Sequence, residues 1–153
     1  MLSAVDPRTV INPQQARRFL TAVEAHSERG RRLKAFFACM YYAALRPEEV
    51  SELRRSNLTD LPEQPGHWGE IRLTSSAAPR SGSRWTESAK SRQQGPLKHR
   101  ALGGHSASAC PPRARVLLRE HLSEYVLDAP EALLFVGAHG GAVTRPHIPP
   151  RIP

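Results

Sequence analysis

The first part of the chain shows apolar residues at the spacing of an amphipathic helix. Ala16, Phe19, Leu20 and Val23 share one helical face. The segment Asn12-Pro13-Gln14-Gln15 precedes them and offers an asparagine N-cap, a proline at the first helical position and a glutamine at the capping-box position. We therefore expect a helix that begins after Asn12 and that Gly30 breaks.

A second apolar stripe predicts a helix over residues 31–45, followed at once by a third helix. The apolar positions of the second helix are Leu33, Phe36, Phe37, Met40, Tyr41 and Ala44. Pro47 ends it, because a proline disfavours the helical conformation of the residue before it, and can itself open the next helix. Glu48 and Glu49 fall in the first turn of that third helix, where the helix dipole favours acids.

The rest of the chain alternates strand-like patterns with loop-forming residues. Residues 68–74 predict a strand, and residues 75–95, rich in Ser, Arg and Gly, predict a long loop. Residues 97–102 and 106–110 are further candidate strands, and Pro111-Pro112 introduces another helix. The apolar positions of that helix are Val116, Leu117, Leu118, Leu122 and Tyr125. This order predicts a mainly helical α+β fold with a small antiparallel sheet.

The positive net charge of the chain predicts that its partner is an anion. The chain of 153 residues carries a formal net charge of +8. Residues 71–119 contain ten Lys or Arg against the single acid Glu87, while the flanking segments are close to neutral. A basic middle of this kind favours a nucleic-acid-binding face, with a solvated arginine-rich loop as the alternative.

Several classes of protein are disfavoured by what the sequence holds. Cys39 and Cys110 lie far apart in sequence without ligands at metal-binding spacing, so no metal site is predicted. Cys39 falls within an apolar helix and is expected in the core. We find no signal-peptide pattern and no apolar run of about 18 residues, so no membrane association is expected and a cytoplasmic location is predicted.

The segment Leu45-Arg46-Pro47-Glu48-Glu49-Val50 joins two predicted helices through a single arginine. Within the longer run from Ala44 to Leu58, it resembles the first catalytic-arginine box of tyrosine recombinases, the phage-integrase family. This resemblance covers about residues 12–144 and implies the N-terminal part of a DNA breaking–rejoining catalytic domain. It further implies that Arg46 is a catalytic arginine that binds the scissile phosphate; the alternative is that Arg46 caps the preceding helix.

The same family has a lysine on a β-hairpin, and the string Pro96-Leu97-Lys98-His99-Arg100 resembles that hairpin. Together with the segment from Phe135 to Gly141, it is similar to a bacterial integrase-like subgroup. The resemblance implies that Lys98 is a general acid, against the alternative of an ordinary surface lysine. The basic residues predicted to contact double-stranded DNA are Arg80, Arg84, Lys90, Arg92 and Arg100. No cofactor is implied, because arginines and a lysine neutralise the phosphate charge in this family.

Two further family markers are not found in the sequence. The family's His-x-x-Arg box has no convincing counterpart, since His147 to Arg151 contains two prolines. Tyr41, Tyr42 and Tyr125 all fall too early to match the family's late tyrosine nucleophile. We therefore expect a truncated, bacterial site-specific recombinase that does not recombine DNA by itself, with enzymatic activity left open.

The expected organisation is an N-terminal tail at 1–11, a partial catalytic domain at 12–144 and a proline-rich tail at 145–153. A non-enzymatic basic module that binds DNA through phosphate contacts is the alternative function, and a fragment without a stable fold is a weaker one. The resemblance implies that a full-length parent protein can self-associate. For this chain, the sequence leaves self-association open.

Overall fold

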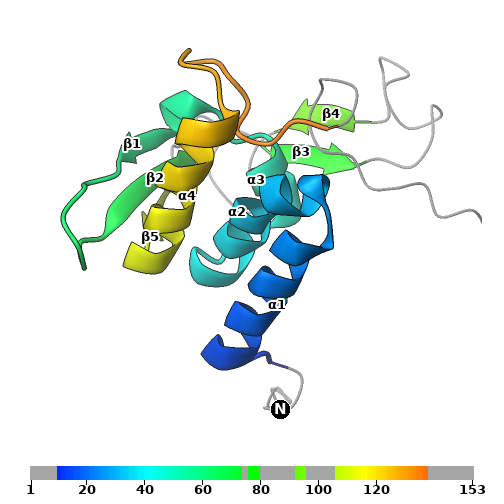
Figure 1. Ribbon diagram of the computed structural model, residues 1–153. Helices are drawn as coiled ribbons and strands as arrows, with labels where there is room; N and C mark the ends of the chain where they lie inside the picture. Colours follow the sequence, from blue (N-terminus) through cyan, green and yellow to red (C-terminus); the bar gives the residue numbers. More distant parts are fainter. Residues whose placement is uncertain (1–9, 74–75, 80–91, 96–105, 138–153) are drawn as a thin grey trace, which may run out of the picture.

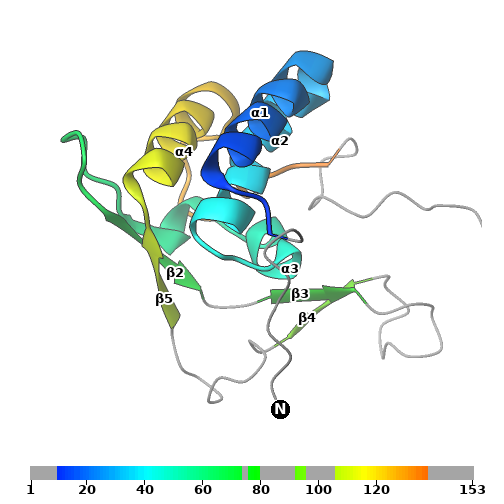
Figure 2. The ribbon, with the colours of Figure 1, turned by 90° about the horizontal axis from the view of Figure 1, so that it is seen from below.

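The computed structural model describes residues 10–73, 76–79, 92–95 and 106–137. Two layers form this part of the protein: a helical layer and a small antiparallel sheet (Figures 1 and 2). A separate two-stranded hairpin lies on the right in Figure 1. The predicted fold class, mainly helical α+β with a small antiparallel sheet, is confirmed.

Helix α1 comprises Pro13–His26, and helix α2 comprises Glu28–Tyr42. The predicted capping box of α1 is confirmed: the Asn12 side chain accepts from the Gln15 amide at 2.9 Å, and the Gln15 side chain accepts from the Asn12 amide at 2.9 Å. The predicted break at Gly30 is wrong. Ser27 ends α1 and caps α2, accepting from the Gly30 amide at 3.0 Å.

Gly30 has a packing role instead of a helix-breaking role. It is buried in the first turn of α2, and a Cβ atom there would lie 1.9 Å from the carbonyl oxygen of Val23 in α1. The absence of a side chain therefore lets the two helices approach closely, which the sequence pattern alone could not distinguish from a helix stop.

Helix α3 is the short helix Pro47–Ser51, as the proline and the acids predict, and a 3₁₀ turn at Arg55–Asn57 follows it. Strands β1 (Leu58–Asp60), β2 (Gly69–Leu73) and β5 (Ser106–Cys110) form an antiparallel sheet in the order β1-β2-β5. The predicted strands at 68–74 and 106–110 are confirmed, whereas β1 was not predicted because its three residues are too few to show alternation.

Strands β3 (Ser76–Pro79) and β4 (Arg92–Gly95) pair as an antiparallel hairpin in which Ser76 faces Gly95 and Pro79 faces Arg92. Both strands fall inside the predicted loop 75–95, and their Ser-, Gln- and Ala-rich composition has low strand propensity. Backbone pairing, rather than side-chain pattern, defines this hairpin. The candidate strand at 97–102 lies outside the described residues.

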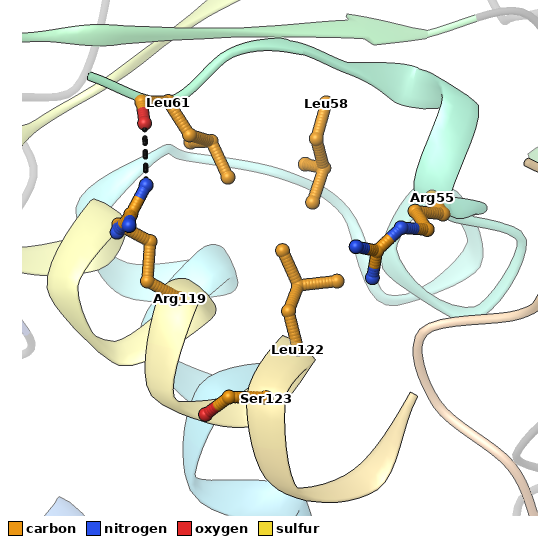
Figure 3. A pocket seen from close by; sticks show the side chains of 6 residues that line it. All are labelled: Arg55, Leu58, Leu61, Arg119, Leu122 and Ser123. Carbon is orange, nitrogen blue, oxygen red and sulfur yellow. Dashed lines mark hydrogen bonds between the residues drawn. The ribbon is translucent and has the colours of Figure 1, made fainter. Parts of the chain in front are cut away.

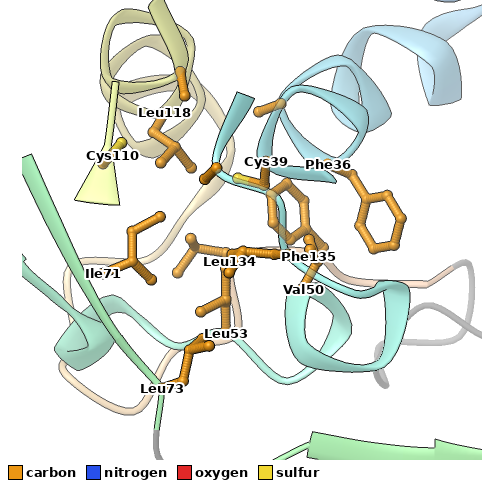
Figure 4. Close-up of a cluster of buried hydrophobic side chains, with 14 residues drawn as sticks. Phe36, Cys39, Val50, Leu53, Ile71, Leu73, Cys110, Leu118, Leu134 and Phe135 are labelled. Atoms are coloured by element: carbon orange, nitrogen blue, oxygen red, sulfur yellow. The ribbon is translucent and has the colours of Figure 1, made fainter. Parts of the chain in front are cut away.

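Helix α4 (Pro112–Tyr125) begins at the predicted double proline and packs between α2 and the sheet. The core lies where α2, α3, the sheet and α4 meet (Figure 4). Its fully buried members include Cys39, Val50, Ile71, Leu118 and Leu134. Burying these side chains stabilises the fold by about 1.5–3 kcal/mol each before entropy is counted.

Helix α4 also buries polar residues that a hydrophobic pattern could not identify. Its predicted apolar position Val116 is exposed, while Arg115 and His121 are buried. The His121 ring packs against Phe135, with ring centroids 4.8 Å apart, and its Nε2 lies 2.6 Å from the Leu134 carbonyl oxygen. His121 thereby attaches the segment after α4 to the helix.

Candidate nucleic-acid interface

The junction between α2 and α3 presents Arg46 on the protein surface. Helix α2 ends at Tyr42, and Ala44 adopts a left-handed conformation with a φ of 52°. The amides of Ala43 and Leu45 both donate to the carbonyl of Cys39, at 3.1 Å and 3.4 Å. The buried Leu45 side chain anchors the junction. Backbone amides therefore donate to the Cys39 carbonyl at the end of α2. Arg46 follows in an exposed, extended conformation.

The backbone of Arg46 is fixed by the helix that it opens. Its amide donates to the carboxylate of the buried Glu49 at 2.9 Å, and its carbonyl accepts from the amides of Glu49 and Val50 at 2.9 Å and 3.0 Å. Arg46 thus occupies the N-cap position of α3, with Pro47 as the first helical residue. Among the described residues, its guanidinium makes no hydrogen bond or ion pair.

Helix α3 packs against strand β3, so the Arg46 junction lies next to the β3–β4 hairpin (Figure 2). Arg92 is the first residue of β4 and pairs with Pro79. Lys98 comes shortly after the end of β4 and lies outside the described part of the chain, as do Arg80, Arg84, Lys90 and Arg100. The structure therefore places the Arg46 junction beside the hairpin that contains one other predicted site residue, Arg92.

Most described cations elsewhere have an acidic partner. The pairs join Arg31 and Arg32 to Glu28, Lys34 to Glu24, Arg54 to Glu131, Arg55 to Asp128, Arg72 to Glu70 and Arg119 to Glu63. Within the described ranges, the exposed arginines without an ion pair are Arg17, Arg18, Arg29, Arg46 and Arg113. Arg46 is thus one of five exposed arginines without an ion pair among the described residues.

The basic segment 71–119 is less available to an anion than its charge count suggests. Arg72 and Arg119 are paired with acids, and Arg115 is 2% exposed. The Nε and Nη1 atoms of Arg115 have no hydrogen-bond partner among the described residues. All three side chains belong to the predicted DNA-binding segment, and an acidic partner or burial makes each less available to DNA.

The three tyrosine hydroxyls have different environments. The Tyr41 hydroxyl donates to the carbonyl of Ile11 at 3.1 Å, and the buried Tyr42 hydroxyl has no partner in the described part of the structure. A hydrogen bond to Glu124 raises the pKa of Tyr125, with a small contribution from burial, so its phenolate is disfavoured.

The two cysteine thiols lie inside the protein. Both cysteines are buried in the core, as predicted for Cys39. Burial raises the pKa of Cys110 to about 11 and raises that of Cys39 further, so both remain protonated at neutral pH. Across the described residues, no three His, Cys, Asp or Glu side chains gather in a way that could hold a metal ion. Within the same residues, we find no helix with the length and apolarity needed to cross a membrane.

Comparison with known proteins identifies the fold. No family model matches the chain, and no curated sequence matches it. Among solved structures, the chain is similar to the Tn1549 transposon integrase in complex with circular-intermediate DNA, with a TM-score of 0.63, 13% identity, and coverage of 94% of this chain and 43% of that one. The same integrase in complex with transposon right-end DNA gives a TM-score of 0.62 at 13% identity, with 94% and 42% coverage.

These comparisons show that the chain has the fold of part of a transposon integrase. It spans about two fifths of the length of the structures that it matches. The predicted partial integrase catalytic fold is thereby confirmed as a fold.

Proposed function

We propose that this chain is part of the catalytic domain of a tyrosine-recombinase-type DNA recombinase, with residues 12–144 as the domain, and that it binds double-stranded DNA. The observation that carries the proposal is Arg46: its backbone is fixed by Glu49, its guanidinium has no described partner, and the β3–β4 hairpin lies beside it. The likeness of the fold to an integrase solved with DNA supports the same function.

The proposed chemistry at this site is phosphate binding. A guanidinium donates two parallel hydrogen bonds to phosphate oxygens, and a fixed backbone reduces the entropy lost when it does so. In strand exchange, such a group would stabilise the additional negative charge of the pentacoordinate transition state. Lys98, which follows the hairpin, is our candidate for the general acid that protonates the leaving 5′ oxygen.

We further propose that the 153-residue chain by itself binds DNA without forming a covalent intermediate. The environments of its three tyrosines support this, because one hydroxyl is bonded to the backbone, one is buried, and one has a raised pKa. Binding then depends on the DNA phosphates, as in the non-enzymatic basic module predicted as the alternative from the sequence.

The test is DNA affinity as a function of salt for the unmodified chain and matched variants. Arg46→Ala should weaken binding by about 1–3 kcal/mol, the contribution of a hydrogen bond to a charged group, and leave the melting temperature nearly unchanged. Arg29→Ala is the control: it removes the same charge from an exposed arginine without an ion pair at the opposite end of α2. Equal effects of the two changes would contradict a specific phosphate site at Arg46.

A second variant tests the contribution of the basic segment. Replacing Arg80, Arg84, Lys90 and Arg92 with Ser should flatten the dependence of log affinity on log salt, by about 0.9 for each phosphate that the protein no longer neutralises. An unmodified chain whose affinity does not change with salt would show that this segment is a solvated surface, and the DNA-binding proposal would fail.

A further inference from the structure

A second surface feature does not involve Arg46. A cavity of about 360 Å³ opens between α4 and the segment from the 3₁₀ turn to β1 (Figure 3). Its described lining consists of Arg55, Leu58, Leu61, Arg119, Leu122 and Ser123. The three leucines pack on the core with part of their surface still exposed, so the floor is apolar. The two arginines stand on opposite sides of that floor (Figure 3).

Both arginines are held in place but keep part of their charge exposed. Arg119 Nη1 donates to the Leu61 carbonyl at 2.9 Å, and its Nη2 pairs with Glu63. Arg55 pairs with Asp128 at 3.1 Å. The Glu63 and Asp128 side chains are 82% and 94% exposed. Such exposed ion pairs contribute little, so another carboxylate could add to them or replace them. The cavity therefore suits an apolar side chain flanked by acids.

The turn after α4 has this composition. Leu127 is 78% exposed, more than any other large hydrophobic side chain in the described part of the chain. Asp128 follows it, and Glu131 is 80% exposed. The turn is also held in one conformation: the Ser56 amide donates to the Pro130 carbonyl, and the Arg55 amide donates to the Ala132 carbonyl, both at 2.9 Å. An exposed leucine in a fixed turn, with acids after it, loses little entropy when it is bound.

We propose that the cavity between α4 and β1 binds the 127–131 turn of a second copy of this chain. Leu127 of one copy enters the space among Leu58, Leu61 and Leu122 of the other, where its apolar surface leaves water. The acids of the turn then approach the arginines that flank the cavity.

The arrangement of turn and cavity supports a two-fold symmetric contact. Asp128 pairs with Arg55, so the turn and the cavity are neighbours within one molecule. A two-fold axis beside them places each turn in the other copy's cavity, which closes the assembly at a dimer. The cavity lining does not include Arg46. This proposal therefore does not rest on DNA binding.

The experiment is sedimentation velocity of the full chain over a range of concentrations, after nuclease treatment so that nucleic acid cannot bridge copies. We expect reversible dimerisation. Leu127→Lys should weaken it about tenfold or more, because an apolar side chain no longer leaves water and a positive charge meets the arginines. Val116→Lys is the control, since Val116 is an exposed apolar residue of α4 outside the cavity. It should leave dimerisation unchanged.

A complementary variant acts on the cavity instead of the turn. Ser123→Trp should fill the cavity from its exposed rim without changing a core residue, and should weaken dimerisation to a similar degree. Mixing the Leu127→Lys and Ser123→Trp proteins should restore a heterodimer, because one intact turn meets one intact cavity. A chain that remains monomeric at every concentration, or a dimer that neither variant weakens, would overturn the proposal.

Discussion

The carboxylate of Glu49 accepts a hydrogen bond from the backbone amide of Arg46 at 2.9 Å, and Glu49 is itself buried. This hydrogen bond acts together with those that the Arg46 carbonyl accepts from the Glu49 and Val50 amides, and they fix the chain where α2 ends and α3 begins. It holds the residue that carries the proposed phosphate-binding side chain while leaving that side chain exposed. The position of Arg46 therefore depends on a neighbour that never meets the DNA in the proposed site.

Glu49→Ala should reduce both stability and DNA affinity. Removal of the side chain leaves the Arg46 amide without its partner and costs about 1 kcal/mol, as for other N-terminal helix caps. Chemical unfolding in urea measures this loss. The neighbouring Glu48→Ala is the control, because Glu48 lies in the same helical turn without this hydrogen bond to Arg46. A Glu49→Ala protein that binds DNA as tightly as the original would contradict the positioning role.

Gly30→Ala should destabilise the α1–α2 pair. The new Cβ atom would lie 1.9 Å from the Val23 carbonyl oxygen, so the helices must separate, at a cost of about 1–3 kcal/mol or more. Arg29→Ala places a methyl group at the adjacent, exposed position and should be neutral or slightly stabilising. Thermal unfolding of the two variants distinguishes them, and a Gly30→Ala protein with an unchanged melting temperature would show that the close approach is not required.

His121 should make stability depend on pH. Burial lowers the pKa of His121, although its hydrogen bond to the Leu134 carbonyl partly opposes this. That carbonyl only accepts, so Nε2 carries the proton and the buried Nδ1 is left without a partner in the described residues. Because the unfolded state binds the second proton more readily, stability is full above the unfolded pKa of about 6.5 and falls as the pH drops below it.

Urea unfolding between neutral and mildly acidic pH tests this direction. His121→Gln can still donate to Leu134 but does not titrate, so its stability should change less over the same range. His67→Gln replaces an exposed histidine and should keep the pH dependence of the original chain. If stability instead increases on acidification, His121 is charged in the folded protein and the assignment is wrong.

The 153-residue chain should form no covalent adduct with DNA. The Tyr41 hydroxyl is hydrogen-bonded to the backbone, and the Tyr42 hydroxyl is buried. The pKa of Tyr125 is raised. Incubation with nicked duplexes that trap a phosphotyrosine link, followed by denaturing electrophoresis, is the measurement. A band that survives denaturation and maps by mass spectrometry to any of these tyrosines would refute the expectation.

The sequence by itself determined the elements whose signals are local. Asn12 and Pro13 start α1, Pro47 and the acids after it start α3, and Pro111-Pro112 precedes α4, because capping, proline geometry and the helix dipole act within one turn. Helical periodicity likewise predicted α2, apart from its limits. The sequence also predicted an arginine at the α2–α3 junction, because that prediction depends only on where the two helices end and begin.

Tertiary structure alone decided which charges are free and which segments meet. Arg119 pairs with Glu63 on a distant segment, and Arg115 is buried by packing. The Arg72–Glu70 pair is different, because alternation along one strand places both side chains on the same face. The hairpin β3–β4 forms by backbone pairing that its composition does not predict, and packs beside α3. Distance between residues far apart in the chain depends on how all the elements pack together, and no local pattern encodes it.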